Sequence, residues 1–176
     1  MSHTLKVLTS AKTDEQYTPD NVIVAVLEAL QVIDLDPCSN SHEFPNIPAR
    51  YRYTQADDGL SKPWCCPDGT PARVYMNHPY SDSRWITYLI SEYQSGRVCE
   101  AIALTKSATD TRWYQEMAQF PLCFWNGRLK FKNPDNKSGA APFGSTLFYL
   151  GQNPARFARV FARYGRIYYP ANYRIS

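Results

Sequence analysis

The feature that most constrains the fold is an alternation of short apolar runs with segments in which apolar residues recur every three or four positions. Short runs rich in β-branched and aromatic residues are typical of strands, and the wider spacing is typical of helices. We expect helices after Pro19 and over residues 85–93, 110–119 and 154–164, and strands over residues 32–36, 51–54, 73–76, 101–104, 122–125, 128–132 and, as the last strand, 146–150. This alternation indicates an α/β sheet.

Proline, glycine and small polar residues mark the interruptions. Residues 38–50 contain Ser39-Asn40 and two prolines, so we expect a loop there. Residues 133–142 are rich in Pro, Gly, Ser and Asn, and we expect an exposed loop. Thr18 or Asp20 is expected to cap the first helix, because Thr and Asp side chains accept hydrogen bonds from the first free N–H groups of a helix.

Length and composition fit one globular domain. The chain has 176 residues, of which 44% are apolar and 20% charged, so we expect a flexible segment over residues 1–13 and a single domain over residues 14–176. No apolar run approaches the ~20 residues that cross a membrane, and the first residues are not typical of a signal peptide. A cytoplasmic protein is expected. The five cysteines are an odd number with no Cys-x-x-Cys pair, so neither a disulfide framework nor a metal site is expected.

The charge is divided unevenly along the chain. Residues 1–100 hold 8 Lys and Arg against 13 Asp and Glu, a net charge of −5. Residues 101–176 hold 11 against 3, a net charge of +8. An acidic half beside a basic half favours a cationic small molecule at one site and a polyanion at another. A basic, solvated helix face is the alternative explanation for the second half.

A candidate catalytic turn, Asn77-His78-Pro79-Tyr80, follows the strand expected over residues 73–76. In an open α/β sheet, ligands bind at the carboxyl ends of strands. The Asn77 oxygen and a backbone carbonyl of the turn can both accept hydrogen bonds from an aromatic amino group, which makes its nitrogen more nucleophilic. The Tyr80 ring offers a face on which a base rotated out of its helix can stack.

Two more segments carry polar groups at expected element ends. Tyr17-Thr18-Pro19 precedes the first helix, and Asp36-Pro37-Cys38 ends the first strand. The turn Asp57-Asp58-Gly59 follows the second strand.

The ordered series of these motifs resembles the phage adenine-specific DNA methyltransferase (Dam-type) family from about residue 14 to residue 165. The family's catalytic motif is Asn/Asp-Pro-Pro-Tyr, from which this chain departs at His78, and the usual glycine-rich continuation after Asp36-Pro37-Cys38 is absent. The resemblance implies a single-domain, Rossmann-like methyltransferase sheet with flanking helices and no separate target-recognition domain. It also implies a phage- or prophage-encoded enzyme that acts in a bacterial cell.

The resemblance further implies site residues. S-adenosylmethionine would be bound by a set comprising Tyr17, Thr18, Pro19, Asp36, Pro37, Cys38 and Asp58, with Asp36 facing the methionine ammonium and Asp58 near the adenosine. The catalytic set would be Asn77, His78, Pro79 and Tyr80.

DNA is the expected partner of the basic half, with contacts from Arg112, Arg128, Lys130, Lys132 and Lys137, because Lys and Arg neutralise phosphates. Trp113, Trp125 and Phe143 are candidates to support the rotated base, although core packing is favoured for Trp125. Without a separate target-recognition domain, sequence selectivity is expected to come from loops such as residues 133–142 or from a partner subunit. A homodimer is a further option for the assembly.

Two alternatives remain open from the sequence. The turn at Asn77 also suits methylation of protein glutamine, of cytosine or guanine, or of RNA, although Asn rather than Ser or Asp at this position favours adenine. A non-catalytic nucleic-acid-binding protein on a decayed methyltransferase fold is the second alternative, for which His78 and the shortened cofactor loop argue.

Overall fold

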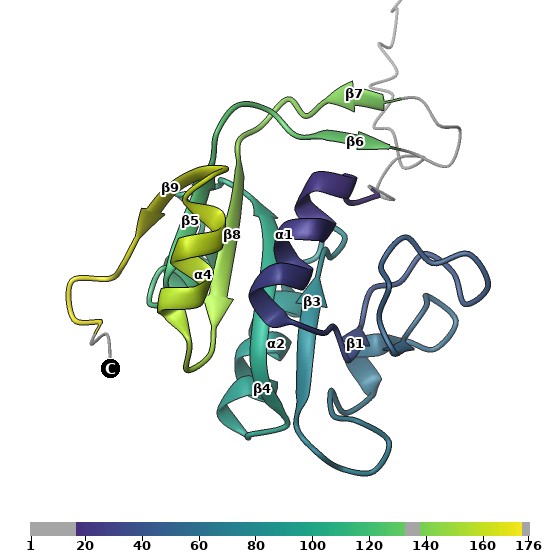
Figure 1. Ribbon diagram of the computed structural model, residues 1–176. Coiled ribbons are helices and arrows are strands. Elements are labelled where there is room, and N and C mark those ends of the chain that lie inside the picture. Colours follow the sequence, from purple (N-terminus) through teal and green to yellow (C-terminus); the bar gives the residue numbers. More distant parts are fainter. Residues whose placement is uncertain (1–16, 133–137, 174–176) are drawn as a thin grey trace, which may run out of the picture.

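A seven-stranded mixed sheet with helices on both faces forms the body of the protein (Figure 1). The computed structural model describes residues 17–132 and 138–173. The sheet contains β1 (Leu35–Asp36), β2 (Tyr51–Arg52), β3 (Ala72–Met76), β4 (Val98–Lys106), β5 (Leu122–Trp125), β8 (Ser145–Leu150) and β9 (Gly165–Tyr168), in the order β2-β1-β3-β4-β8-β5-β9. The helices are α1 (Asp20–Leu30), α2 (Arg84–Gln94), α3 (Arg112–Met117) and α4 (Pro154–Phe161), with a 3-10 turn, η1 (Gly59–Ser61). The expected α/β class is confirmed.

The sheet has a parallel half and an antiparallel half. β2, β1, β3 and β4 are paired in parallel, whereas β4 with β8, β8 with β5, and β5 with β9 are antiparallel. Five strands, β2, β1, β3, β4 and β5, therefore run in the same direction. The carboxyl ends of β1, β3 and β4 consequently lie along one edge of the sheet.

Each face of the sheet has its own apolar layer, because successive side chains of a strand point to opposite sides. Tyr75 on β3 packs with residues of α1 and α4, whereas its neighbours Val74 and Met76 pack with residues of α2 and α3. Figure 1 shows α1 and α4 on the near face of the sheet and α2 behind it. The catalytic-turn candidate that follows Met76 thus emerges between two packed layers.

A separate hairpin stands at the carboxyl-end edge. It consists of β6 (Lys130–Lys132) and β7 (Ser138–Ala140), and in Figure 1 it crosses above α1. The backbone N–H of Tyr17 donates to the Lys132 carbonyl at 2.9 Å, which ties the hairpin to the segment before α1. Residues 138–140 were expected to be loop, and this expectation is wrong because they pair with β6. Lys137, residues 133–137 and the expected flexible segment over residues 1–13 lie outside the described residues.

Several element boundaries differ from those expected. The first strand is limited to residues 35–36, and α3 spans 112–117 rather than 110–119. α4 ends at Phe161 rather than at residue 164, and the chain returns as β9 beside β5. The strand over residues 145–150 is therefore not the last. Only four residues form β9, and their pairing depends on a partner about forty positions earlier, which local patterns do not reveal.

The expected cap of α1 is also wrong. Pro19 occupies the N-cap position, and no side chain accepts a capping hydrogen bond there. The Thr18 hydroxyl is instead bonded to Tyr75 and Asn77, away from the helix. The Thr18 hydroxyl therefore bonds residues that are distant in the sequence and does not cap the helix.

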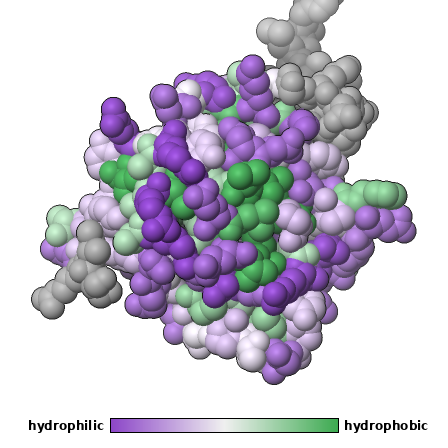
Figure 2. Space-filling model, in the orientation of Figure 1, coloured by the Kyte–Doolittle hydropathy of each residue, from purple (hydrophilic) through white to green (hydrophobic). Residues whose placement is uncertain are grey.

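The surface formed by α1 and α4 is divided by polarity. Figure 2 shows a hydrophobic patch over α1, where Val24 is 57% exposed, beside the hydrophilic side chains of α4. Arg163, two residues after the end of α4, pairs with Glu28 of α1 across this boundary. None of the helices among the described residues is both long and apolar enough to cross a bilayer.

We predict that Gly165→Ala destabilises the fold by separating β9 from β5. A Cβ atom at this position would lie 2.0 Å from the Phe124 carbonyl oxygen, so backbone must move, and overpacking of this kind costs about 1–3 kcal/mol. The measurement is the urea midpoint of unfolding. Gly139→Ala is the matched control, because a Cβ there meets nothing within 4 Å. Equal midpoints for the two variants would contradict the proposed contact.

Candidate functional site

The ends of β1 and β3 bring two polar side chains to one place. Leu35 of β1 pairs with Val74 of β3 in parallel register. Asp36 and Asn77 come shortly after this pair in their strands, so both lie at the same edge of the sheet. This is the edge at which ligands bind in sheets of this kind. The structure thus joins two segments that lie about forty residues apart in the sequence.

A cavity of about 1030 Å³ opens at this edge. Eight of the expected site residues line it: Tyr17, Thr18, Asp36, Pro37, Cys38, Asp58, Asn77 and Pro79. Pro19, His78 and Tyr80 are not among its lining residues. A cavity of this size suits a small-molecule ligand, for which sites of ~300–1,000 Å³ are usual.

Asp36 is the principal charged group of the cavity. The residue is 3% exposed, and one carboxylate oxygen accepts a hydrogen bond from the Cys38 N–H at 3.0 Å. Burial raises the pKa of Asp36 from 3.8 to about 7, although the Cys38 N–H, the Ser39 side chain and the charge of Arg52 act in the opposite direction. A bound cation would favour the ionised form, so this carboxylate is suited to a positively charged ligand.

The turn that carries Asp58 is packed against Asp36-Pro37. Asp58 has a φ of 52°, and a Cβ atom on the next residue, Gly59, would lie 2.4 Å from the Pro37 carbonyl oxygen. The Trp64 indole N–H donates to the Gly59 carbonyl at 2.8 Å, and the Trp85 ring lies over the glycine. Glycine is therefore required for the close approach that places Asp58 at the cavity.

The adjacent Asp57 has a different role. Its carboxylate accepts hydrogen bonds from the Thr54 N–H at 2.7 Å and the Thr54 hydroxyl at 2.8 Å, and it contacts His42 at 2.7 Å. The Thr54 backbone bond is the main reason that the pKa of Asp57 is lowered to about 2. Asp57 thus stabilises the turn, and Asp58 lines the cavity.

Asn77 is held by the segment before α1. Its amide nitrogen donates to the Thr18 hydroxyl oxygen at 3.1 Å, and the same oxygen lies 3.0 Å from the Tyr75 hydroxyl. Asn46 bonds both backbone groups of Thr18, accepting from its N–H at 2.7 Å and donating to its carbonyl at 3.2 Å. The wall of the cavity and the candidate catalytic turn are therefore connected through one threonine.

His78 and Tyr80 lie beside the cavity in an aromatic cluster. His78 is 5% exposed, and its ring meets the Tyr80 ring edge-on at a centroid distance of 5.5 Å. Tyr80 also meets Phe143 at 5.5 Å and Phe131 of β6 at 6.4 Å. The turn and the base of the hairpin therefore share one set of aromatic contacts. Trp125 stacks on Tyr164 at 5.0 Å and packs against the core, as favoured from the sequence.

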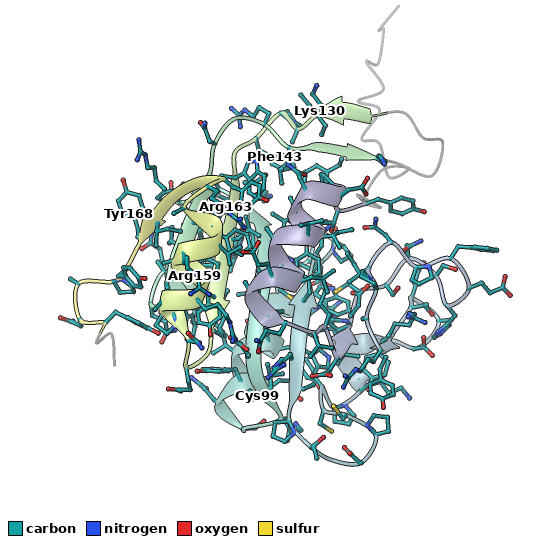
Figure 3. All side chains as sticks on the ribbon, in the orientation of Figure 1. Cys99, Lys130, Phe143, Arg159, Arg163 and Tyr168 are labelled. Atoms are coloured by element: carbon teal, nitrogen blue, oxygen red, sulfur yellow. The ribbon has the colours of Figure 1, made fainter. Side chains whose placement is uncertain are left out.

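Three of the expected DNA-contacting side chains lie at the edge of the sheet that carries the hairpin. Arg128, Lys130 and Lys132 are exposed on or beside the hairpin. Figure 3 shows Lys130 and Phe143 at the end opposite Cys99, which lies near the start of β4. Because β4 runs towards the hairpin, these groups lie at the edge that carries Asn77.

Two of the expected basic contacts, Arg112 and Lys132, have acidic partners. Arg112 pairs with Glu116 one helical turn away at 3.0 Å. Lys132 lies 3.5 Å from the Asp20 carboxylate, which offsets part of its charge.

Some lining residues were not expected from the sequence. Asn46, Ile47 and His42 come from the loop over residues 38–50, and Trp85 comes from α2. The loop sequence indicates only that turns are present. Pairing of Asn46 with the Thr18 backbone depends on how the loop folds over the sheet edge, so no local signal identifies it.

Comparison with known proteins identifies the family. The family model described as DNA N-6-adenine-methyltransferase (Dam) matches residues 4–152. No curated protein and no solved structure gives a significant match. The family match covers every segment that lines the cavity and the whole turn from Asn77 to Tyr80. This chain therefore belongs to the Dam family of DNA adenine N6-methyltransferases.

Proposed function

We propose that this chain transfers a methyl group from S-adenosylmethionine to the exocyclic N6 amino group of an adenine rotated out of DNA. One observation carries the proposal: Asn77 and Asp36 line the same cavity at the carboxyl ends of paired parallel strands. The cavity therefore offers a carboxylate for a cationic cofactor and, at its wall, an amide for the target base.

The cavity fits the cofactor in charge as well as in size. DNA methyltransferases as a class use S-adenosylmethionine, which carries an ammonium and a sulfonium group and supplies the electrophilic methyl. Two carboxylates, Asp36 and Asp58, line the cavity, and none of its described lining residues is Lys or Arg. We assign Asp36 to the ammonium, and Asp58 to the adenosine amino group or ribose. Tyr17, Thr18, Pro19, Pro37 and Cys38 complete the proposed cofactor site.

The catalytic turn activates the target nitrogen without a titrating base. The lone pair of an adenine amino group is delocalised into the ring. Acceptance of its N–H hydrogen bonds by the Asn77 side-chain oxygen and the His78 carbonyl lets the nitrogen become more tetrahedral as it attacks. Pro79 restricts the turn that positions these acceptors.

The aromatic cluster beside the turn receives the rotated base. Tyr80 is half-buried as a residue, and its ring is supported edge-on by His78 and Phe143. Among the described residues its buried hydroxyl has no hydrogen-bond partner, and burial raises its pKa. The ring face, rather than the hydroxyl, is thus the functional part of Tyr80.

The hairpin is the proposed DNA contact. Three exposed basic side chains lie at the same end as the cavity: Arg128, Lys130 and Lys132. Basic side chains of this kind contact the phosphates of DNA. Arg112 and Lys137 are the remaining proposed contacts. We also propose that the sheet is a Rossmann-like methyltransferase sheet without a separate target-recognition domain, so selectivity would come from the segment over residues 133–142 or from a second subunit.

We predict that Asp36→Asn weakens the binding of S-adenosylmethionine by about one to two decades, because a charged hydrogen bond contributes roughly 1.5–3 kcal/mol. Binding to the wild type should strengthen by about fivefold from pH 6 to pH 7 as the carboxyl ionises around its pKa of about 7. The ligand ammonium remains protonated over this range. Calorimetric titration of both proteins across this range is the measurement. A pH dependence that persists in Asp36→Asn would assign it to another group.

We predict that Asn77→Ala lowers the rate of methyl transfer by ~10²–10³ while cofactor affinity is nearly unchanged, because the proposed role of the lost acceptor is to bond the target amino group and not the cofactor. Tyr80→Phe should retain much of the activity, and His78→Pro should be at least as active as the wild type. The assay is transfer of labelled methyl to duplex and single-stranded DNA, with digestion to nucleosides. Asn21→Ala, on the exposed face of α1, is the control. A methylcytosine product, or a wild-type rate for Asn77→Ala, would refute the assignment.

We predict that DNA binding weakens as salt rises, and that Arg128→Ala with Lys130→Ala flattens this dependence. Each lost phosphate contact with duplex DNA lowers the slope of log affinity against log salt by about 0.9, so the pair should lower it by about 1.8. Fluorescence anisotropy at several salt concentrations measures the slope. Arg159→Ala with Arg166→Ala removes the same charge from α4 and β9 and serves as the control (Figure 3). If both pairs lower the slope equally, the hairpin is not the contact.

A further inference from the structure

We infer that Thr18 is a positioning residue for Asn77: its hydroxyl holds the Asn77 amide nitrogen and thereby directs the amide oxygen at the target amino group. This inference rests on the proposed function, in which that oxygen accepts a hydrogen bond from adenine. It gives Thr18 a role in the chemical step, in addition to its place in the wall of the cofactor cavity.

The first support is the geometry of the contact. An amide nitrogen can only donate a hydrogen bond, so the Thr18 hydroxyl oxygen, at 3.1 Å, must be the acceptor. The carbonyl oxygen of the same amide is on the opposite branch, away from Thr18. The hydroxyl can form its second bond, to Tyr75, in either direction.

The second support is that Thr18 is itself held firmly. Thr18 is 2% exposed as a residue, Asn46 bonds both of its backbone groups, and Pro19 restricts the backbone that follows. The β-branched side chain has few rotamers, and Tyr75, which is fully buried, fixes the other side of the hydroxyl. Because Asn46, Pro19 and Tyr75 all restrict Thr18, its hydroxyl is fixed in place and can orient the Asn77 amide at the cavity.

The third support is chemical. A primary amide can present either its oxygen or its NH₂ group to a ligand, and only the oxygen can accept from an adenine amino group. If the amide were turned the other way, its NH₂ group would face the adenine amino group, and two hydrogen-bond donors would oppose each other. The catalytic turn therefore needs a partner that selects one orientation, and the Thr18 hydroxyl is placed to do so. Val at this position would keep the shape and lose the bond, whereas Ser would keep the hydroxyl.

The test compares Thr18→Val with Thr18→Ser in the full-length chain. We expect Thr18→Val to lower kcat about tenfold at saturating cofactor and DNA, which corresponds to the loss of one hydrogen bond. Thr18→Ser should stay within about twofold of the wild type. In a chain that carries Asn77→Ala, adding Thr18→Val should cause no further decrease, because Thr18 acts through Asn77. Calorimetric titration of each variant separates any change in cofactor affinity.

Several outcomes would overturn the inference. A Thr18→Val protein with weakened cofactor binding but a wild-type kcat would make Thr18 a cofactor contact only. An equal tenfold decrease in the Asn77→Ala background would show that Thr18 does not act through Asn77.

A second measurement needs no enzymatic activity. In ¹⁵N-labelled protein, the Asn77 side-chain amide protons should be protected from exchange in the wild type and in Thr18→Ser, and should lose this protection in Thr18→Val. Unchanged protection in a folded Thr18→Val protein would refute the bond itself. If the wild type instead shows this protection but forms no 6-methyladenine, the proposed function fails and the positioning role falls with it, although the bond stands.

Discussion

The parallel pairing of β1, β3 and β4 is the constraint on which the rest of the site depends. Parallel strands end at the same edge of a sheet, so Asp36 and Asn77 come together although they are far apart in the sequence. The segments that follow β1, β2 and β3 line the cavity at this edge. The antiparallel half of the sheet returns the chain to this edge, where the hairpin carries exposed positive charge.

Two opposite electrostatic environments therefore lie close together. Asp36 is buried among few compensating groups, so its pKa is high and a cation would stabilise its charge. Arg128 and Lys130 are exposed and form no ion pair among those found in the described residues. Under the proposed function, a cationic cofactor and a polyanionic substrate would have separate places on the same edge, with the turn at Asn77 between them. The uneven charge of the two halves of the sequence has this spatial counterpart.

Most of the fold could be predicted, because strand and helix patterns are local. Apolar periodicity identified α2 and β8 to within one residue at each end. β9 was missed, and β7 was expected to be loop. Both are short, and each forms only because a partner strand is present, β5 for β9 and β6 for β7. Contacts between residues that are distant in the sequence decide this pairing, so local sequence patterns do not predict it.

The sequence by itself determined the chemistry that is available: an Asp at the end of one strand, an Asn-x-Pro-Tyr turn at the end of another, and a basic second half. Only the tertiary structure decided how these groups are used. The sequence predicts that Thr18 caps the first helix, yet in the fold its hydroxyl bonds Tyr75 and Asn77. The reason is physical. A buried hydroxyl bonds the partners that the surrounding fold brings within about 3 Å, and here those partners lie on β3 and directly after it, nearly sixty residues away in the sequence.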